Sequence, residues 1–130
     1  MTFFPNVVEI NTGTNVFWEL DRLNDLSIAD AVYSSSAVPG IFMPRKIGWG
    51  YYADDGIVDS LPIKFVKVRK ADLIMAALGR VFFAEKAVQW EGLAILLSRS
   101  SAIQTDTILD LNLHDCLDCP LVIINLVPPM

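Results

Sequence analysis

Two carboxylates stand side by side at Asp54 and Asp55, after an apolar aromatic run and directly before Gly56. A carboxylate on a tight turn at a strand end is a common place for a catalytic base. Burial of either group would disfavour ionisation of both, because their like charges repel. Asp-Gly is also among the commonest turn signals. The residue types therefore leave a catalytic base and an ordinary turn both open.

Two other chemistries fit these carboxylates less well. A glycoside hydrolase needs two carboxyl groups on opposite sides of a bond, at least about 5 Å apart, which neighbours at a turn do not provide. A metal site built from Asp54, Asp55 and Asp59 lacks the alternating ligand spacing of a calcium loop. We therefore expect no metal at this turn.

Cysteine and serine clusters suggest further chemistry that their context does not support. Cys116 and Cys119, with His114 upstream, offer three ligands where zinc wants four, and Pro120 leads into an apolar run rather than the helix of a redox motif. We expect two buried thiols and no cofactor. The serines at 34–36 have no Gly-x-Ser-x-Gly around them, so we interpret them as helix-end hydroxyls.

The composition limits the class of protein. The 130 residues suit one domain with a real core, and 53% are hydrophobic, above the usual range of about 45–50%. No apolar run approaches the roughly 18–20 residues of a transmembrane helix. The net charge of −5 argues against nucleic-acid binding, which usually requires a surface rich in Lys and Arg. The first residues lack the basic start and cleavage site of a signal peptide, so we expect a cytoplasmic setting.

The elements that must position Asp54 alternate between strands and helices. Periodicity and turn residues predict strands at 7–10 and 16–20, a helix at 28–36, strands at 45–47 and 51–53, a helix at 63–70, a strand at 73–78, helix over about 83–113 and a strand at 121–124. Ser27 and Asp30 form a capping box for the first helix. The strands at 73–78 and 121–124 are continuous apolar runs, so we expect both to be buried on two faces in an α/β fold.

Four short motifs follow one another between Ser27 and Leu78. They are Ser-Ser-Ala-Val-Pro-Gly-Ile-Phe at 35–42, Tyr-Ala-Asp at 52–54, Ser-Leu-Pro at 60–62 and Ala-Asp-Leu-Ile at 71–74. In this order they closely resemble the second half of the patatin-like phospholipase domain. The residues at 7–18 fit the preceding strands of that family loosely, so the resemblance covers most of the chain.

The resemblance implies a serine acyl hydrolase of lipids or esters, with a three-layer α/β/α sandwich and a mostly parallel central sheet. Asp54, Asp55 and Gly56 occupy its aspartate motif. In such enzymes the aspartate, here Asp54, is the proton acceptor for a nucleophilic serine, so no histidine and no cofactor is needed. The serine carries the acyl group, and backbone N–H groups of a glycine-rich loop stabilise the oxyanion.

Two departures from the family stand out. The serine elbow and the glycine-rich loop are absent from the 130 residues, so 1–130 resembles one incomplete domain, the C-terminal half. Losing a nucleophile costs about a million-fold in rate, so we expect the chain alone to be inactive. Asp55 also stands where the family has glycine. Because aspartate tolerates left-handed backbone less well than glycine, we expect strain there or a misdirected Asp54.

Three functions compete. The first is half of a lipid acyl hydrolase, whose serine half lies on another chain or has been lost from the reading frame. Its partners would be a lipid or ester substrate and either a second chain that supplies the serine half or a further copy of itself. The residues do not show whether membranes are touched. The second is a degenerate, non-catalytic binding module of the same fold. The third, an esterase using Ser36 or a neighbour, is the least supported because no elbow surrounds these serines.

Overall fold

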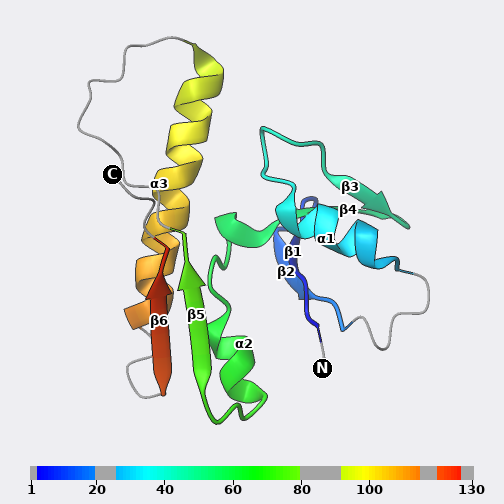
Figure 1. The fold of residues 1–130 in the computed structure, drawn as a ribbon. Coiled ribbons are helices and arrows are strands. Elements are labelled where there is room, and N and C mark those ends of the chain that lie inside the picture. The colour runs from blue at the N-terminus through cyan, green and yellow to red at the C-terminus, as the bar shows by residue number, and fades with distance from the viewer. Residues whose placement is uncertain (1–2, 20–25, 80–91, 115–119, 127–130) are drawn as a thin grey trace. The chain divides into compact units, whose positions relative to one another are not determined.

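A computed structural model describes residues 3–19, 26–79, 92–114 and 120–126 (Figure 1). The chain divides into two compact units, Met1–Val58 and Asp59–Met130, which are described separately below.

The first unit contains an antiparallel sheet with strand order β2-β1-β4-β3. Its elements are β1 (Asn6–Glu9), β2 (Thr14–Phe17), α1 (Ile28–Ser36), β3 (Arg45–Ile47), β4 (Gly50–Asp54) and the single 3₁₀ turn η1 (Asp55–Ile57). The β1–β2 turn closes where the Gly13 N–H, at φ +69°, donates to the Glu9 carbonyl oxygen at 2.8 Å. The left-handed backbone at Gly13 is one that glycine adopts without penalty. Both predicted hairpins are confirmed to within a few residues.

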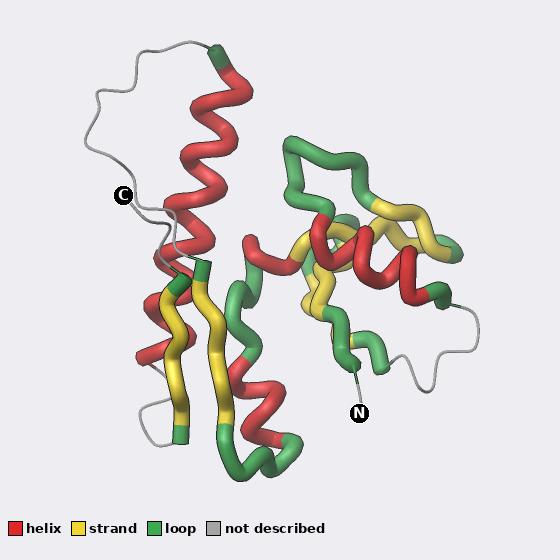
Figure 2. Tube along the Cα trace, viewed as in Figure 1, coloured by secondary structure: helices red, strands yellow, loops and turns green. Residues whose placement is uncertain are grey.

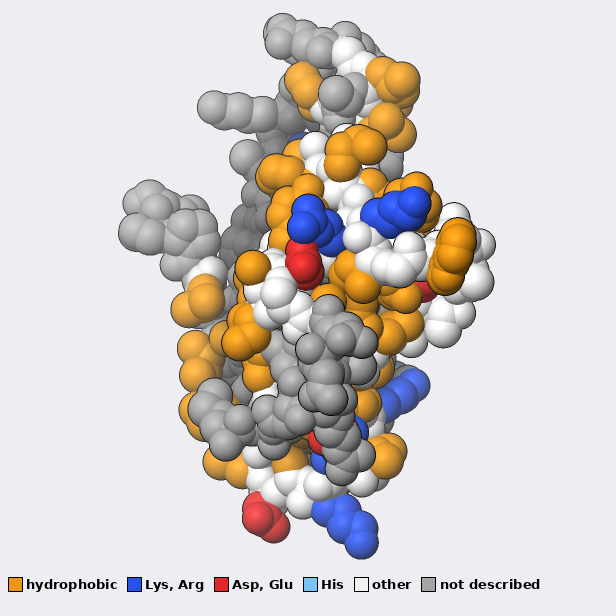
Figure 3. Space-filling view, turned by 90° about the vertical axis from the view of Figure 1, so that its right-hand side faces the viewer, with side chains coloured by type: hydrophobic (Ala, Val, Ile, Leu, Met, Phe, Trp, Pro, Cys, Tyr) orange, Lys and Arg blue, Asp and Glu red, His pale blue; other side chains and the backbone are white. Residues whose placement is uncertain are grey.

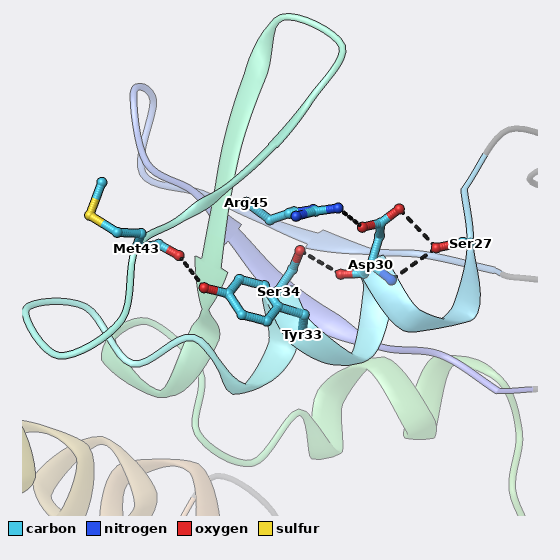
Figure 4. A network of polar contacts seen from close by, with 6 residues as sticks. All are labelled: Ser27, Asp30, Tyr33, Ser34, Met43 and Arg45. Atoms are coloured by element: carbon cyan, nitrogen blue, oxygen red, sulfur yellow. Dashed lines mark hydrogen bonds and ion pairs between the residues drawn. The ribbon is translucent and has the colours of Figure 1, made fainter.

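Helix α1 begins at a capping box, as its sequence predicts. The Ser27 hydroxyl oxygen accepts the Asp30 backbone N–H at 3.0 Å and donates to the Asp30 carboxylate at 2.8 Å (Figure 4). The Arg45 guanidinium lies 2.6 Å from the same carboxylate. The Ser27 hydrogen bond, followed by the charge of Arg45, lowers the pKa of Asp30. These contacts join the start of α1 to β3.

The cap gives the first prediction. Ser27→Ala should lower the free energy of unfolding by about 1 kcal/mol, since it removes the acceptor for a helix N–H that has no partner within the helix. Ser27→Thr keeps a hydroxyl at this position and should retain most of the stability. Urea unfolding followed by circular dichroism measures both variants, and equal stability of Ser27→Ala and the wild type would contradict a stabilising cap.

The core of the first unit lies between α1 and the sheet. Val7, Trp18 and Ala31 form a buried cluster, against which partly buried side chains such as Tyr52 pack. The Trp18 and Tyr52 rings meet edge to face with centroids 4.9 Å apart, an arrangement that aromatic pairs prefer. This packing fixes β1 and β4 beneath α1.

The second unit combines a two-stranded parallel sheet with two helices. Its elements are α2 (Ile63–Val68), β5 (Ile74–Leu78), α3 (Leu93–His114) and β6 (Leu121–Asn125). Strands β5 and β6 lie side by side (Figure 2). They run parallel, with Ile74 opposite Leu121. Helix α2 ends at Val68, two residues before the predicted end, and Lys70 follows in left-handed backbone at φ 56°. The predicted helical residues 83–91, including Ala87 and Trp90, lie outside the described residues.

The prediction that β5 and β6 are buried on both faces is wrong for the described residues. Strand β5 alternates, with Ile74, Ala76 and Leu78 buried and Met75 64% exposed. Most of β6 is exposed. The buried side chains of β5 pack with residues of α2 and α3, such as Ile63 and Leu109. A continuous apolar run is buried on two faces only where both are covered, and these contacts cover one.

The α/β class is confirmed, but the sheets differ from the expected central sheet. The described residues form one four-stranded antiparallel sheet and one two-stranded parallel sheet, rather than one mostly parallel sheet. Many large hydrophobic side chains also lie at the surface, where Figure 3 shows them alongside charged ones. Within the part of the chain that the structure describes, no helix is both long and apolar enough to cross a membrane.

Candidate active site

The backbone of Asp54 is held by β1 and by the end of α1 within the first unit. Asp54 is the last residue of β4, where it lies opposite Val7 of β1. Its N–H donates to the carbonyl oxygen of Ala37, the residue that caps the end of α1, at 3.0 Å. The sequence correctly predicts that the β3–β4 hairpin delivers Asp54 to the end of a strand. Its anchorage to Ala37 is a contact that the sequence did not reveal.

The side chain of Asp54 is oriented by the turn that follows it. One carboxylate oxygen accepts the Gly56 backbone N–H at 2.8 Å, which caps η1. Asp54 is partly exposed. A general base must be oriented and within hydrogen-bond reach of the proton that it takes. The hydrogen bond from Gly56 orients Asp54, and its partial exposure leaves the carboxylate open to a proton donor.

The neighbouring Asp55 lies in a different environment. Asp55 is 2% exposed, and its carboxylate accepts a hydrogen bond from the side-chain amide of Asn6 on β1. Among the described residues Lys70 is the one non-glycine residue with positive φ, so Asp55 is not left-handed. The expected left-handed strain at Asp55 is therefore absent, because η1 is a right-handed turn that accepts a side chain. The two aspartates thus differ in burial and in partners.

The serines of α1 remain helix residues in the structure. Ser34 is fully buried, and its hydroxyl donates to the Asp30 carbonyl oxygen one turn earlier at 2.7 Å (Figure 4). This backbone hydrogen bond is the usual role of a serine within a helix. Ser35 is partly exposed and Ser36 is exposed in the last turn. Burial therefore argues against a nucleophile at Ser34.

Among the described residues, no three His, Cys, Asp or Glu side chains are grouped so that they could hold a metal ion. His114 is the exposed last residue of α3. Cys116 and Cys119 lie outside the described residues. Asp59, in the second unit, instead accepts a hydrogen bond from the Asn112 side-chain amide of α3 at 2.7 Å.

Asp59 gives a prediction on pH dependence. Burial raises its pKa above the ordinary value, more than its hydrogen bonds and Lys64 lower it. The folded state therefore binds the Asp59 proton more tightly than the unfolded state does. As the pH rises from the ordinary pKa of aspartate through the higher pKa of Asp59 in the folded state, the free energy of unfolding should fall. Asp59→Asn keeps an acceptor for Asn112 but cannot ionise, so it should be the more stable protein near neutral pH.

Urea unfolding of wild type and Asp59→Asn between pH 3 and pH 7 measures this difference. The two curves should converge at the acid end, where Asp59 is protonated in both the folded and the unfolded states. A constant difference across the whole range would show that ionisation of Asp59 is not its cause.

An oriented carboxylate at a strand end of an α/β fold is the arrangement of a candidate acid–base site. Residues 3–67, half of the chain, match the family model of the patatin-like phospholipases. The chain therefore belongs to the patatin-like phospholipase family, a family of lipid acyl hydrolases. The matched residues include the antiparallel sheet, α1 and residues 54–56.

Proposed function

We propose that the chain is the C-terminal part of a patatin-like lipid acyl hydrolase in which Asp54 is the proton acceptor of a Ser-Asp dyad. The observation that carries this proposal is the orientation of the Asp54 carboxylate by the Gly56 N–H, inside the region that matches the family. A serine hydroxyl near Asp54 would give its proton to the carboxylate as its oxygen attacks the ester carbonyl carbon.

The rest of the reaction follows from the same two groups. Collapse of the tetrahedral intermediate expels the alcohol, which takes the proton back from Asp54, and leaves the acyl group on the serine. Water then gives a proton to Asp54 as its oxygen attacks the acyl carbon. Collapse of this second intermediate releases the fatty acid, and the serine oxygen takes the proton back from Asp54. In both acylation and deacylation, backbone N–H groups of the oxyanion loop stabilise the negative charge on the carbonyl oxygen.

In this proposal Asp54, Asp55 and Gly56 form the motif, and residues 1–130 belong to one incomplete three-layer α/β/α domain. The serine and the oxyanion loop come from residues that the 130 do not include, because these contain no Gly-x-Ser-x-Gly. Those residues would lie on a second chain or on a longer form of this one. The substrate is a lipid or another carboxylic ester, met in the cytoplasm or at a membrane surface.

Two assays test the proposal. The isolated chain should neither react with a fluorophosphonate probe nor hydrolyse p-nitrophenyl butyrate, since it lacks the nucleophile. Co-expression with the serine-bearing half of a patatin-like domain should restore hydrolysis, with the probe on the serine of the added half. Labelling of any serine of the isolated chain would contradict the assignment of the nucleophile to another segment.

The second candidate function is a non-catalytic binding module. It is favoured by the absent serine elbow and by Asp55 in place of the family's glycine. The right-handed backbone at Asp55 weakens the second of these points, because the turn forms without left-handed strain. A Gly-x-Ser-x-Gly in frame upstream of Met1 would favour the enzyme, and its absence would favour the binding module.

A further inference from the structure

Asn6 is joined to the aspartate motif across the sequence. It is the first residue of β1, and its side-chain amide donates to the carboxylate of Asp55, 49 residues away. Both residues belong to the first unit. Asp55 is 2% exposed and Asn6 is partly exposed, so this hydrogen bond is part-buried, with its acceptor on the buried side.

A carboxylate inside a protein needs hydrogen bonds that replace those it loses from water. Asn6 supplies such a bond from a strand that is itself paired on both sides, with β2 and with β4. The donor itself lies opposite Phe17 of β2, next to the residues of β1 that pair with β4, and from there its side chain holds Asp55.

The position of Asp55 in turn determines the geometry at Asp54. Asp55 is the first residue of η1, and its carbonyl oxygen accepts the Val58 N–H at 2.7 Å, which closes the turn. Gly56, the next residue, donates its N–H to the Asp54 carboxylate. A shift of Asp55 would move the Gly56 N–H and release the carboxylate that it orients.

We propose that Asn6 is a positioning residue for the Asp54 carboxylate, which it controls by anchoring Asp55 inside the first unit. Asp55 is then the buried anchor of the motif in this chain, and the glycine of the family needs no such partner. The catalytic consequence rests on the proposed function of Asp54, whereas the anchoring itself does not.

Hydrogen exchange of the Gly56 amide in the isolated, isotope-labelled chain tests the anchoring. Asn6→Ala should raise its exchange rate roughly tenfold, since the turn opens more often once Asp55 is released. Asn11→Ala, in the exposed β1–β2 turn, is the matched control and should leave this rate unchanged. In an Asp55→Gly background Asn6→Ala should have no effect on the rate. An equal effect of Asn6→Ala in both backgrounds, or none in either, overturns the proposal.

A second measurement needs no substitution and covers the case in which Asn6→Ala does not fold. The side-chain amide protons of Asn6 in the unmodified chain should exchange at least about ten times more slowly than those of the exposed Asn11. Exchange at the rate of Asn11 overturns the proposal.

The catalytic consequence is measured after the serine-bearing half has been added. Asn6→Ala should lower kcat roughly tenfold with KM unchanged, because it displaces the base and does not touch the substrate. An unchanged kcat together with faster Gly56 exchange overturns the link to Asp54. If no hydrolysis is restored with the wild-type chain, the proposed function fails, and the exchange experiments still decide whether Asn6 anchors Asp55.

Discussion

Asp54→Asn should lower the restored ester-hydrolysis rate by about 10²–10⁴-fold while the first unit stays folded. The amide oxygen of asparagine can still accept the Gly56 N–H, so the cap of η1 is kept. The amide cannot take a proton from serine at neutral pH, so the base is lost. The measurement is kcat for p-nitrophenyl butyrate in the presence of the serine-bearing half, with circular dichroism to follow the fold.

The matched control is Asp55→Asn, the same change of atoms at the adjacent residue. Its amide oxygen can still accept the hydrogen bond from Asn6, and its rate should stay within a few-fold of the wild type. Asp55→Gly, which installs the residue of the family, should also remain active. If Asp55→Asn lost activity while Asp54→Asn kept it, the base would be Asp55, and our alignment of the motif would be wrong by one residue.

Ile63→Ala should destabilise the second unit by about 2–5 kcal/mol. Ile63 is 2% exposed and packs in a cluster with Ile74 and with partly buried side chains of α2, α3 and β6. Its truncation removes buried apolar surface and leaves a cavity that the neighbouring side chains fill only in part. An effect of this size is a large share of the stability of a small domain.

Val68→Ala is the control on the same helix. Val68 is the last residue of α2 and is 81% exposed, so its truncation should change stability by no more than about 0.5 kcal/mol. Because two compact units need not unfold together, hydrogen exchange of the Ile74 and Ala76 amides in β5 is the better measurement for both variants. Equal effects of the two variants would contradict the packing of α2 against β5.

Local features of the fold could be predicted from the residues that form them. The capping box of Ser27 and Asp30 and the turn at Gly13 each depend on residues within a few positions of one another. The end of α2 was less predictable, because Val68 and Lys70 lie in a run of residues that all tolerate a helix. Burial of β5 and β6 was predicted wrongly, since an apolar run does not show how many of its faces are covered.

In the candidate site, too, some features could be predicted from the sequence and others depended on the tertiary structure. The sequence by itself determined that Asp54 ends a strand before a turn, because the aromatic run and Asp-Gly are local signals of that structure. The hydrogen bond from Gly56 to Asp54 is likewise local, because it joins residues two positions apart. Only the tertiary structure decided that Asp55 is buried and held by Asn6. The physical reason is that partners 49 residues apart meet only when β1 and β4 pair, and that pairing depends on the packing of the whole unit.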